Sequence, residues 1–275
     1  MDHTQEKELV ALSALPNPNL QYHFLYQVRD NSLDRYEKPH IHDSYEIYIN
    51  LSGDVSVLVN NNLYKAQKGD AIITRPGDVH LCINHADAPH ARFCLWFQCS
   101  EDSPLIAFTK RQSFNPFLRH SEDTKKELLR LLYQLKDAQD ENREPERTIC
   151  LYRLLILFAE GCQTTPDHAG LPAGMQKVLD YMNENFTQIH CVNDIVKATH
   201  TSSPTLTRWF RTHLQLSPHK YMEALKLSLA QRLLLEGKSV TEACNLSGFP
   251  DYSRFISVFK NKFGQTPLQY QKSHK

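Results

Sequence analysis

The sequence predicts an α+β, multidomain protein: an N-terminal β-barrel of the jelly-roll type with two accessory helices, followed by an all-α domain. Three observations predict it. Short β-rich runs fill residues 20–100, helical periodicity begins at Ser121, and the C-terminal third contains an internal repeat. The length of 275 residues is near twice the typical domain size of roughly 100–150 residues. We expect domains at 1–163 and 174–275, joined by a linker at 164–173.

The barrel is predicted from short runs of β-branched and aromatic residues. Tyr45–Leu51 and Val55–Val59 are two such runs, and the intervening Ser52-Gly53-Asp54 is a turn signal. Further runs are Leu63-Tyr64, Ala71–Ile73 and Arg92–Phe97, with turn signals at Asn60–Asn62 and Pro76-Gly77. Several short strands at such spacing are typical of a small sandwich or barrel.

Two helices are predicted to follow the barrel. Ser121 is a helix N-cap, and leucines recur behind it at helical spacing from Leu128 to Leu135. Pro145 opens a second helix, which is apolar over most of Ile149–Phe158. So wide an apolar surface must be buried against the barrel, the first helix or a second subunit. Dimerisation through either helix is therefore a hypothesis.

Composition excludes several classes of protein. The seven cysteines (82, 94, 99, 150, 162, 191 and 244) are scattered and never spaced C-x-x-C, which argues against a zinc ribbon or a disulfide framework. We expect them to be buried free thiols. The polar N-terminus and the lack of any apolar run near the ~20 residues of a membrane span predict a cytoplasmic protein without a membrane segment.

Charge is divided unevenly between the two halves. From Ala173 onward there are 13 Lys and Arg against 7 Asp and Glu, whereas the preceding residues hold 18 against 24. A basic half joined to an acidic half suggests that only one of them meets a polyanion.

The basic half repeats one supersecondary unit at an offset of 49 residues. The helix caps Ser202 and Asp251 correspond, as do Phe210 and Phe259. Further corresponding pairs are Leu206 and Phe255, Arg211 and Lys260, Leu214 and Phe263, Ser217-Pro218 and Thr266-Pro267, and Tyr221 and Tyr270. Each unit is a helix, a tight turn and a second helix, at about 192–213 and 240–263. The sequence thus contains two helix-turn-helix motifs.

The outer faces of the two trailing helices carry small polar and basic residues opposite an apolar seam. Such a helix suits insertion into a DNA major groove. The candidate DNA-binding residues are Ser203, Pro204, Thr207, Arg208 and Arg211 in the first unit, and Asp251, Tyr252, Ser253, Arg254, Ser257 and Lys260 in the second.

The segment from about Met175 to Tyr270 resembles the DNA-binding domain of the AraC/XylS family of bacterial transcription regulators. Gly248-Phe249, Phe259-Lys260 and Thr266-Pro267 are among the residues that carry the resemblance. It implies two rigidly joined helix-turn-helix units that read neighbouring major-groove segments of double-stranded DNA, and an activator that touches RNA polymerase. It also implies base reading by Arg208. Departures are Ser257, where members often have Arg, and His200, where they often have Gly.

The acidic half carries a second resemblance. His40, His42, Glu46 and His80, with their flanking glycines, resemble the two motifs of a cupin barrel, in which such side chains converge. Period two places His40, His42 and Glu46 on one strand face. The prediction we favour is a metal-free, cofactor-free pocket in which these four residues bind a sugar or related metabolite through hydrogen bonds. A catalytic divalent metal, a sensing or structural metal, and plain core histidines are the alternatives. We expect the histidines at 85, 90, 120 and 168 at the surface or in loops.

Together these features predict a sequence-specific transcription regulator, not an enzyme, with an effector that alters dimer geometry or releases the DNA-binding half. We expect an activator of carbohydrate or related small-metabolite genes. Two alternatives remain: a metal-dependent cupin enzyme fused to a DNA-binding module, and a regulator controlled by a protein partner with a vestigial pocket.

Overall fold

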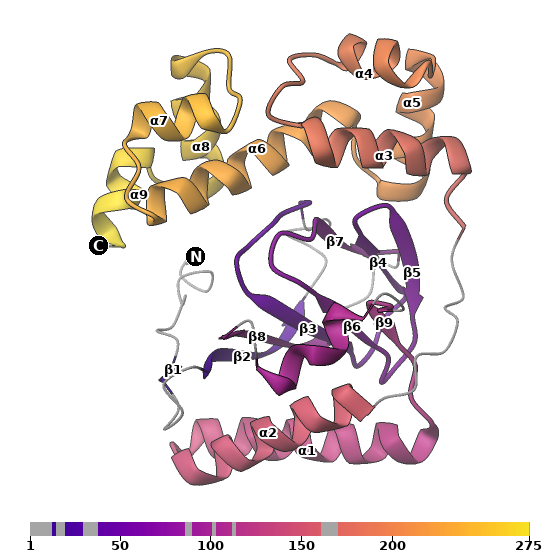
Figure 1. Cartoon of the computed structure of the whole chain (residues 1–275), viewed down its shortest axis with the longest axis vertical. Coiled ribbons are helices and arrows are strands. Elements are labelled where there is room, and N and C mark those ends of the chain that lie inside the picture. The colour runs from indigo at the N-terminus through magenta and orange to yellow at the C-terminus, as the bar shows by residue number, and fades with distance from the viewer. Residues whose placement is uncertain are drawn as a thin grey trace.

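The computed structural model describes residues 13–14, 20–29, 38–85, 90–100, 103–111, 114–160 and 170–274. A β-barrel occupies the middle of the molecule, with two antiparallel helices beneath it and the C-terminal helices above it (Figure 1). The predicted fold class is confirmed. Within the described ranges, no helix combines the length and the apolar composition of a membrane span.

The barrel is built from two antiparallel sheets. Its strands are β1 (Ser13–Ala14), β2 (Leu20–Arg29), β3 (Tyr45–Asn50), β4 (Val55–Val59), β5 (Asn62–Ala66), β6 (Ala71–Thr74), β7 (His80–Asn84), β8 (His90–Cys99) and β9 (Phe117–Leu118). One sheet has the order β1-β2-β8-β3-β6-β9 and the other β5-β4-β7. An isolated antiparallel bridge between His40 and His80 connects the segment before β3 to the edge strand β7.

The strand period of two gives the larger sheet two different faces. Tyr48 of β3 and Cys94 of β8 face the smaller sheet and share a buried core with Val57 of β4. Ile47 and Ile49 face the other way, into a core completed by the accessory helices. Even-numbered residues of β3 therefore point into the barrel.

Two accessory helices cover the outer face of the larger sheet. They are α1 (Glu122–Asp140) and α2 (Glu144–Glu160), and a short 3₁₀ helix, η2 (Pro104–Lys110), precedes them. Ser121 caps α1 as predicted, since its side chain accepts a hydrogen bond from the Thr124 backbone N–H. Leu128, Leu131, Leu132 and Leu135 of α1 are buried in the core that the helix shares with the sheet, and so they cannot contact a second subunit. In α2, by contrast, Ile149 is 58% and Ile156 is 48% exposed.

The C-terminal half consists of helices joined by short turns. Its elements are α3 (Ala173–Asn185), α4 (Val192–Thr199), α5 (Ser203–Trp209), the π-helical turn η3 (Phe210–Leu214), α6 (Pro218–Leu235), α7 (Val240–Leu246), α8 (Tyr252–Phe263) and α9 (Pro267–Ser273). The predicted units are α4 with α5 and η3, and α7 with α8. The caps Ser202 and Asp251 accept backbone hydrogen bonds as predicted. Helix α6 joins the two units (Figure 1).

The tight turns of the two units share a left-handed residue. His200 has φ 52°, and Gly248 has φ 78°. Histidine therefore adopts the conformation that glycine adopts in the second unit, and the first turn keeps its form despite the departure from the family pattern. The cost of left-handed backbone for a residue with a Cβ is about 1–2 kcal/mol.

Some predictions about buried groups are wrong. His90 is 3% exposed and begins strand β8, so it is neither at the surface nor in a loop. His120 lies in the loop between β9 and α1 as predicted, but it is only 6% exposed. The ring of His120 packs near Phe158 of α2, and burial lowers the pKa of this imidazole. Of the cysteines described, Cys191 is exposed, whereas Cys82, Cys94, Cys150 and Cys244 are buried free thiols as predicted. Cys162, His168 and most of the predicted linker lie outside the described residues.

Candidate effector site and nucleic-acid interface

The four residues predicted as an effector site come together at one end of the barrel. His40 and His42 lie on the segment that enters β3, Glu46 lies on β3, and His80 begins β7. The Nε2 atoms of His42 and His80 lie 2.9 and 3.1 Å from the same oxygen, Oε2 of Glu46. One ligand atom from each of the four residues lies within 4.8 Å of the others. The sequence prediction of convergence is thus met by the geometry.

The other ring nitrogen of each histidine is held by the backbone. Nδ1 of His40 lies 3.0 Å from the Lys38 carbonyl oxygen. The corresponding distances are 2.9 Å from His42 to the Ser44 carbonyl and 3.0 Å from His80 to the Asp78 carbonyl. A carbonyl oxygen only accepts, so each Nδ1 carries the proton and donates it. The three Nε2 atoms are thereby directed toward one another and toward Glu46.

Glu46 is an ionised carboxylate in this setting. Burial acts to raise the pKa of Glu46, but the hydrogen bonds with His42 and His80 and the charge of those rings bring the pKa well below its ordinary value. The carboxylate thus supplies a fixed negative centre inside the barrel.

Two neighbours of Glu46 were not predicted from the sequence. Thr74 of β6 and Trp96 of β8 are its partners across the sheet. Cross-strand partners share a face, so both point toward the barrel interior beside the cluster. Thr74 is 3% exposed, and its hydroxyl has no hydrogen-bond partner among the residues that the structure describes. Only the strand register reveals these two residues, and register was not available from the sequence.

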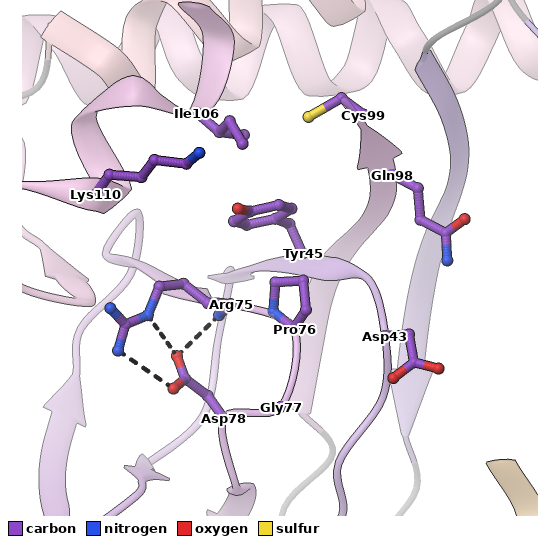
Figure 2. Close-up of a pocket in the computed structure, with 10 residues that line it drawn as sticks. All are labelled: Asp43, Tyr45, Arg75, Pro76, Gly77, Asp78, Gln98, Cys99, Ile106 and Lys110. Carbon is purple, nitrogen blue, oxygen red and sulfur yellow. Dashed lines mark hydrogen bonds and ion pairs between the residues drawn. The ribbon is translucent and has the colours of Figure 1, made fainter. Parts of the chain in front are cut away.

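A larger cavity lies outside the cluster. Its volume is about 800 Å³, and Tyr45 of β3, Arg75, Gln98 and Lys110 are among the residues that line it (Figure 2). None of the four cluster residues lines this cavity. Its acidic and guanidinium groups are already paired: Arg75 with Asp78 within the wall, and Asp43 with Arg232 of α6. The cluster, with its unpartnered Thr74 hydroxyl, is the better candidate for ligand recognition.

The residues predicted to bind DNA are all exposed on the two trailing helices and their caps. Figure 1 shows the two units at opposite ends of α6, above the barrel. In the second unit, Arg254 lies 2.8 Å from His219 and 3.6 Å from Glu223, so this guanidinium is held against α6. Asp251 accepts the Arg254 backbone N–H at 2.6 Å and acts as the helix cap.

A buried lysine fixes the two units together. The Lys226 ammonium of α6 donates to the carbonyl oxygens of Ile189 and Gly248, each at 2.7 Å, and so joins the α3–α4 connection, which leads into the first unit, to the turn of the second unit. Burial, together with the charge of Arg254, lowers the pKa of Lys226. Gly248 also packs tightly on the α3–α4 connection, since a Cβ there would lie 2.0 Å from the Thr187 carbonyl oxygen. These contacts link the turn of the second unit to the segment that leads into the first.

The barrel also contacts the C-terminal half directly. Ser228 of α6 hydrogen-bonds both backbone groups of Ile41, at 3.0 and 2.8 Å. Arg232 of α6 lies 2.9 Å from Asp43. Asn183 of α3 donates to the Asn60 carbonyl oxygen at 3.2 Å. Apolar residues of the smaller sheet, including Leu58 and Leu81, share one core with the first unit.

Two family models match the chain: the AraC-like ligand binding domain over residues 21–155 and the helix-turn-helix domain over residues 195–273. The HTH-type transcriptional activator RhaS of Salmonella schwarzengrund is 25% identical over 238 residues, which cover 83% of this chain and 85% of RhaS. The Msm operon regulatory protein of Streptococcus mutans serotype c is 24% identical over 241 residues, covering 85% and 86% of the two chains. Among solved structures, that of apo ToxT from Vibrio cholerae strain SCE256 is 14% identical with a TM-score of 0.38, covering 92% of this chain and 98% of ToxT.

Proposed function

Because the chain belongs to the AraC/XylS family of bacterial transcription regulators, we propose that it is an effector-responsive activator that binds specific sites on double-stranded DNA. The main observation that supports this proposal is the pair of helix-turn-helix units, which are connected by α6 and by the hydrogen bonds of Lys226. A rigid pair of exposed helices suits two successive major-groove segments. A regulator of this kind works beside the chromosome, so we propose a cytoplasmic location.

Specific base reading is assigned mainly to the first unit. Arg208 is exposed on α5, free to form the bidentate contact with guanine that is worth about 1–3 kcal/mol of discrimination. Ser203, Pro204, Thr207 and Arg211 surround it on the same exposed surface. In the second unit Ser257 is too short for such a contact, so Tyr252, Ser253, Arg254 and Lys260 contribute mainly to backbone positioning.

The proposed effector is a small hydroxyl-rich metabolite such as a sugar. Imidazole and carboxylate groups suit hydroxyls as hydrogen-bond partners, and His40, His42, Glu46 and His80 supply both. The Thr74 hydroxyl adds another polar group, and the Trp96 ring offers an apolar surface beside it. RhaS is named a transcriptional activator and the Streptococcus mutans relative an operon regulatory protein, which supports the activating role.

Two partners follow from this role. RNA polymerase is the partner through which an activator bound near a promoter acts. A second copy of the chain is proposed to pack on α2, where Ile149 and Ile156 are spaced seven residues apart on one helix face and exposed. Light scattering at micromolar concentration tests the dimer: Ile156→Asp should give a monomer, and a wild-type monomer would contradict this assignment.

The DNA-binding proposal is tested by selection from a randomised duplex library with the full-length protein, followed by footprinting. We expect a site that covers two adjacent major-groove segments, and loss of base preference at one position in Arg208→Ala. Retention of every duplex with equal affinity would contradict sequence-specific binding.

The effector proposal is tested by thermal shift against a panel of sugars and sugar acids. Saturation at ~100 Kd stabilises a folded protein by about 2.7 kcal/mol, which is a readily measured shift. Glu46→Gln should abolish the shift, whereas Lys110→Ala in the larger cavity should preserve it. The opposite pattern would move the effector to that cavity.

A further inference from the structure

A small cavity lies between the two helix-turn-helix units, beside α6. Its volume is about 50 Å³, enough for a small polyatomic ion but far below the roughly 300–1,000 Å³ of a metabolite site. Its polar lining comes from three elements: His190 from the α3–α4 connection, His219, Glu223 and Lys226 from α6, and Arg254 from α8. The rest of the lining is apolar and comes from α6 and the turn of the second unit. The cavity therefore lies where the segment that leads into the first unit meets the second unit.

Lys226 brings a buried positive charge to this cavity. The residue is 6% exposed, and its ammonium has three N–H donors. Two of them donate to the Ile189 and Gly248 carbonyl oxygens, each at 2.7 Å. The third has no hydrogen-bond acceptor among the residues that the structure describes. A buried ammonium with one donor left over can bind an acceptor that enters the cavity.

Arg254 brings a second positive charge. Its Nη2 donates to Nε2 of His219 at 2.8 Å and lies 3.6 Å from the Glu223 carboxylate. A guanidinium has five N–H donors, so those on Nε and Nη1 are not used in these contacts. Burial and then the charge of Arg254 lower the pKa of Lys226, so the two cations lie within electrostatic reach of each other. An anion between them would offset this repulsion.

The acidic groups near the cavity do not cancel its charge. Glu223 is the single carboxylate among the lining residues, against the two cations Lys226 and Arg254. The charge of Asp194 also reaches Lys226, but its carboxylate accepts two backbone N–H groups of the α3–α4 connection and does not line the cavity. The lining therefore favours an anion whose oxygens accept hydrogen bonds.

The position of the cavity suits the DNA backbone between two half-sites. Two successive major-groove segments on one face of a duplex are separated by the minor groove, which has a phosphate strand on each side. A protein that places one helix in each segment therefore meets phosphates between its two units. The cavity lies between the units, and Arg254 belongs to the helix α8 that carries the candidate DNA-binding residues of the second.

We propose that this cavity binds one backbone phosphate of the DNA between the two major-groove segments, through the Lys226 ammonium and the Arg254 guanidinium. The inference rests on the proposed DNA-binding function. His190 and His219 lie beside the phosphate, and Arg254 exchanges its contacts with Glu223 and His219 for the phosphate oxygens. Such a contact carries no base information but fixes the register of both units on the duplex.

The proposal is tested with full-length protein and the selected duplex, in which central phosphates are replaced one at a time by uncharged methylphosphonate. Replacement at the bound phosphate should weaken wild-type binding by about fivefold or more. Arg254→Gln should weaken binding to the unmodified duplex by a similar factor, lower the slope of log affinity against log salt by about 1, and no longer respond to that methylphosphonate. Lys226→Met should lose the same response at the same phosphate. Its lower stability does not affect this result, because both duplexes are compared on one protein.

Two further variants complete the test. Glu223→Gln should strengthen binding to the selected duplex and to unrelated duplexes alike, by about threefold, because the carboxylate no longer repels the phosphate or holds Arg254. Lys126→Gln is the matched control: Lys126 is an exposed cation of α1, on the far side of the barrel from the DNA-binding units (Figure 1), so this variant should respond as the wild type does.

The outcomes separate the cavity from the proposed function. Specific binding with the same methylphosphonate response in wild type, Arg254→Gln and Lys226→Met would overturn the phosphate site alone. A response lost in Arg254→Gln but kept in Lys226→Met would place the phosphate outside the cavity and also overturn it. Failure of the wild type to bind any duplex specifically would refute the proposed function, and the phosphate site with it.

Discussion

The two helix-turn-helix units have the same design but differ in what surrounds them. In the first, the recognition helix α5 ends at Trp209 and continues as the π-helical turn η3. In the second, α8 runs unbroken for 12 residues. The first unit shares its hydrophobic core with the smaller sheet of the barrel. The second has a core of its own, formed with the end of α6. The barrel therefore contacts the first unit and α6 directly, whereas the second unit is linked to the barrel only through α6 and the α3–α4 connection in the part of the chain that the structure describes.

The largest expected effect on the free energy of unfolding is at Gly248, where the turn of the second unit packs on the α3–α4 connection. Gly248→Ala should destabilise the protein by about 3–5 kcal/mol, because left-handed strain adds to a clash of the new Cβ with the Thr187 backbone. Gly264→Ala is the matched control: its φ is +71° but nothing lies within 4 Å, so about 1–2 kcal/mol is expected. Urea unfolding of both variants measures the difference. Equal losses would mean that the units do not press together at Gly248.

Removing the buried ammonium is expected to have the next largest effect. Lys226→Met keeps the volume but leaves the Ile189 and Gly248 carbonyl oxygens without their donor, at a cost of about 2–3 kcal/mol in unfolding free energy near neutral pH. If the junction is indeed rigid, affinity for the selected duplex should fall as well. A variant with native stability and affinity would show that the two units keep their relation without Lys226.

The same lysine gives a pH dependence of known sign. Burial lowers the pKa of Lys226 in the folded state, so between that pKa and the unfolded value near 10.4 the unfolded chain binds more protons. Stability of the wild type relative to Lys226→Met should therefore rise with pH in the alkaline range. Urea unfolding of both proteins at neutral and alkaline pH checks this, since other groups titrate equally in both. A relative stability that falls with pH would contradict a depressed lysine pKa.

A smaller effect is expected on the free energy of specific DNA binding, which should depend on base contacts of the first unit more than on those of the second. Arg208→Ala should weaken specific binding by about 1–3 kcal/mol, whereas Ser257→Ala, at the matching place in the second unit, should have little effect. Fluorescence anisotropy with the selected duplex and with single-base variants measures both. If Ser257→Ala matched Arg208→Ala, the proposed division of labour between the units would be wrong.

Local patterns in the sequence predicted most of the fold. The repeat, the caps Ser121, Ser202 and Asp251, and the β-rich runs depend on neighbours along the chain, which a sequence displays directly. Convergence of the histidines with Glu46 was also predictable, because it follows from strand periodicity and the family resemblance. The short helix η2 was missed, since Pro104–Lys110 lacks a helical apolar pattern of useful length.

What could not be predicted depends on contacts between distant segments. Thr74 and Trp96 join the effector site only through strand register. The hold of Ser228 on Ile41 links residues 187 positions apart. His90 and His120 resemble loop histidines in sequence but are buried. In each case the pattern along the chain is ordinary, and the role arises from where folding places the residue.

The smallest predicted effect concerns a feature that the units share. Asp194 accepts the backbone N–H groups of Cys191 and His190, each at 2.9 Å. Glu242 accepts the Ser239 hydroxyl at 2.7 Å and the Ser239 backbone N–H at 2.9 Å. These hydrogen bonds lower the pKa of both carboxyls, so the stabilisation is present above about pH 4, where the unfolded groups titrate, and is lost as pH falls toward the folded values. Asp194→Asn and Glu242→Gln should remove this pH-dependent stabilisation from the N-terminus of α4 and of α7, respectively. Amide hydrogen exchange in α4 and α7, compared with wild type at the same pH, measures the loss in each unit separately.

Because the first unit is also held by the barrel, α4 should tolerate its substitution better than α7 does. Greater exchange in α4 would mean that the barrel contributes nothing to the stability of the first unit.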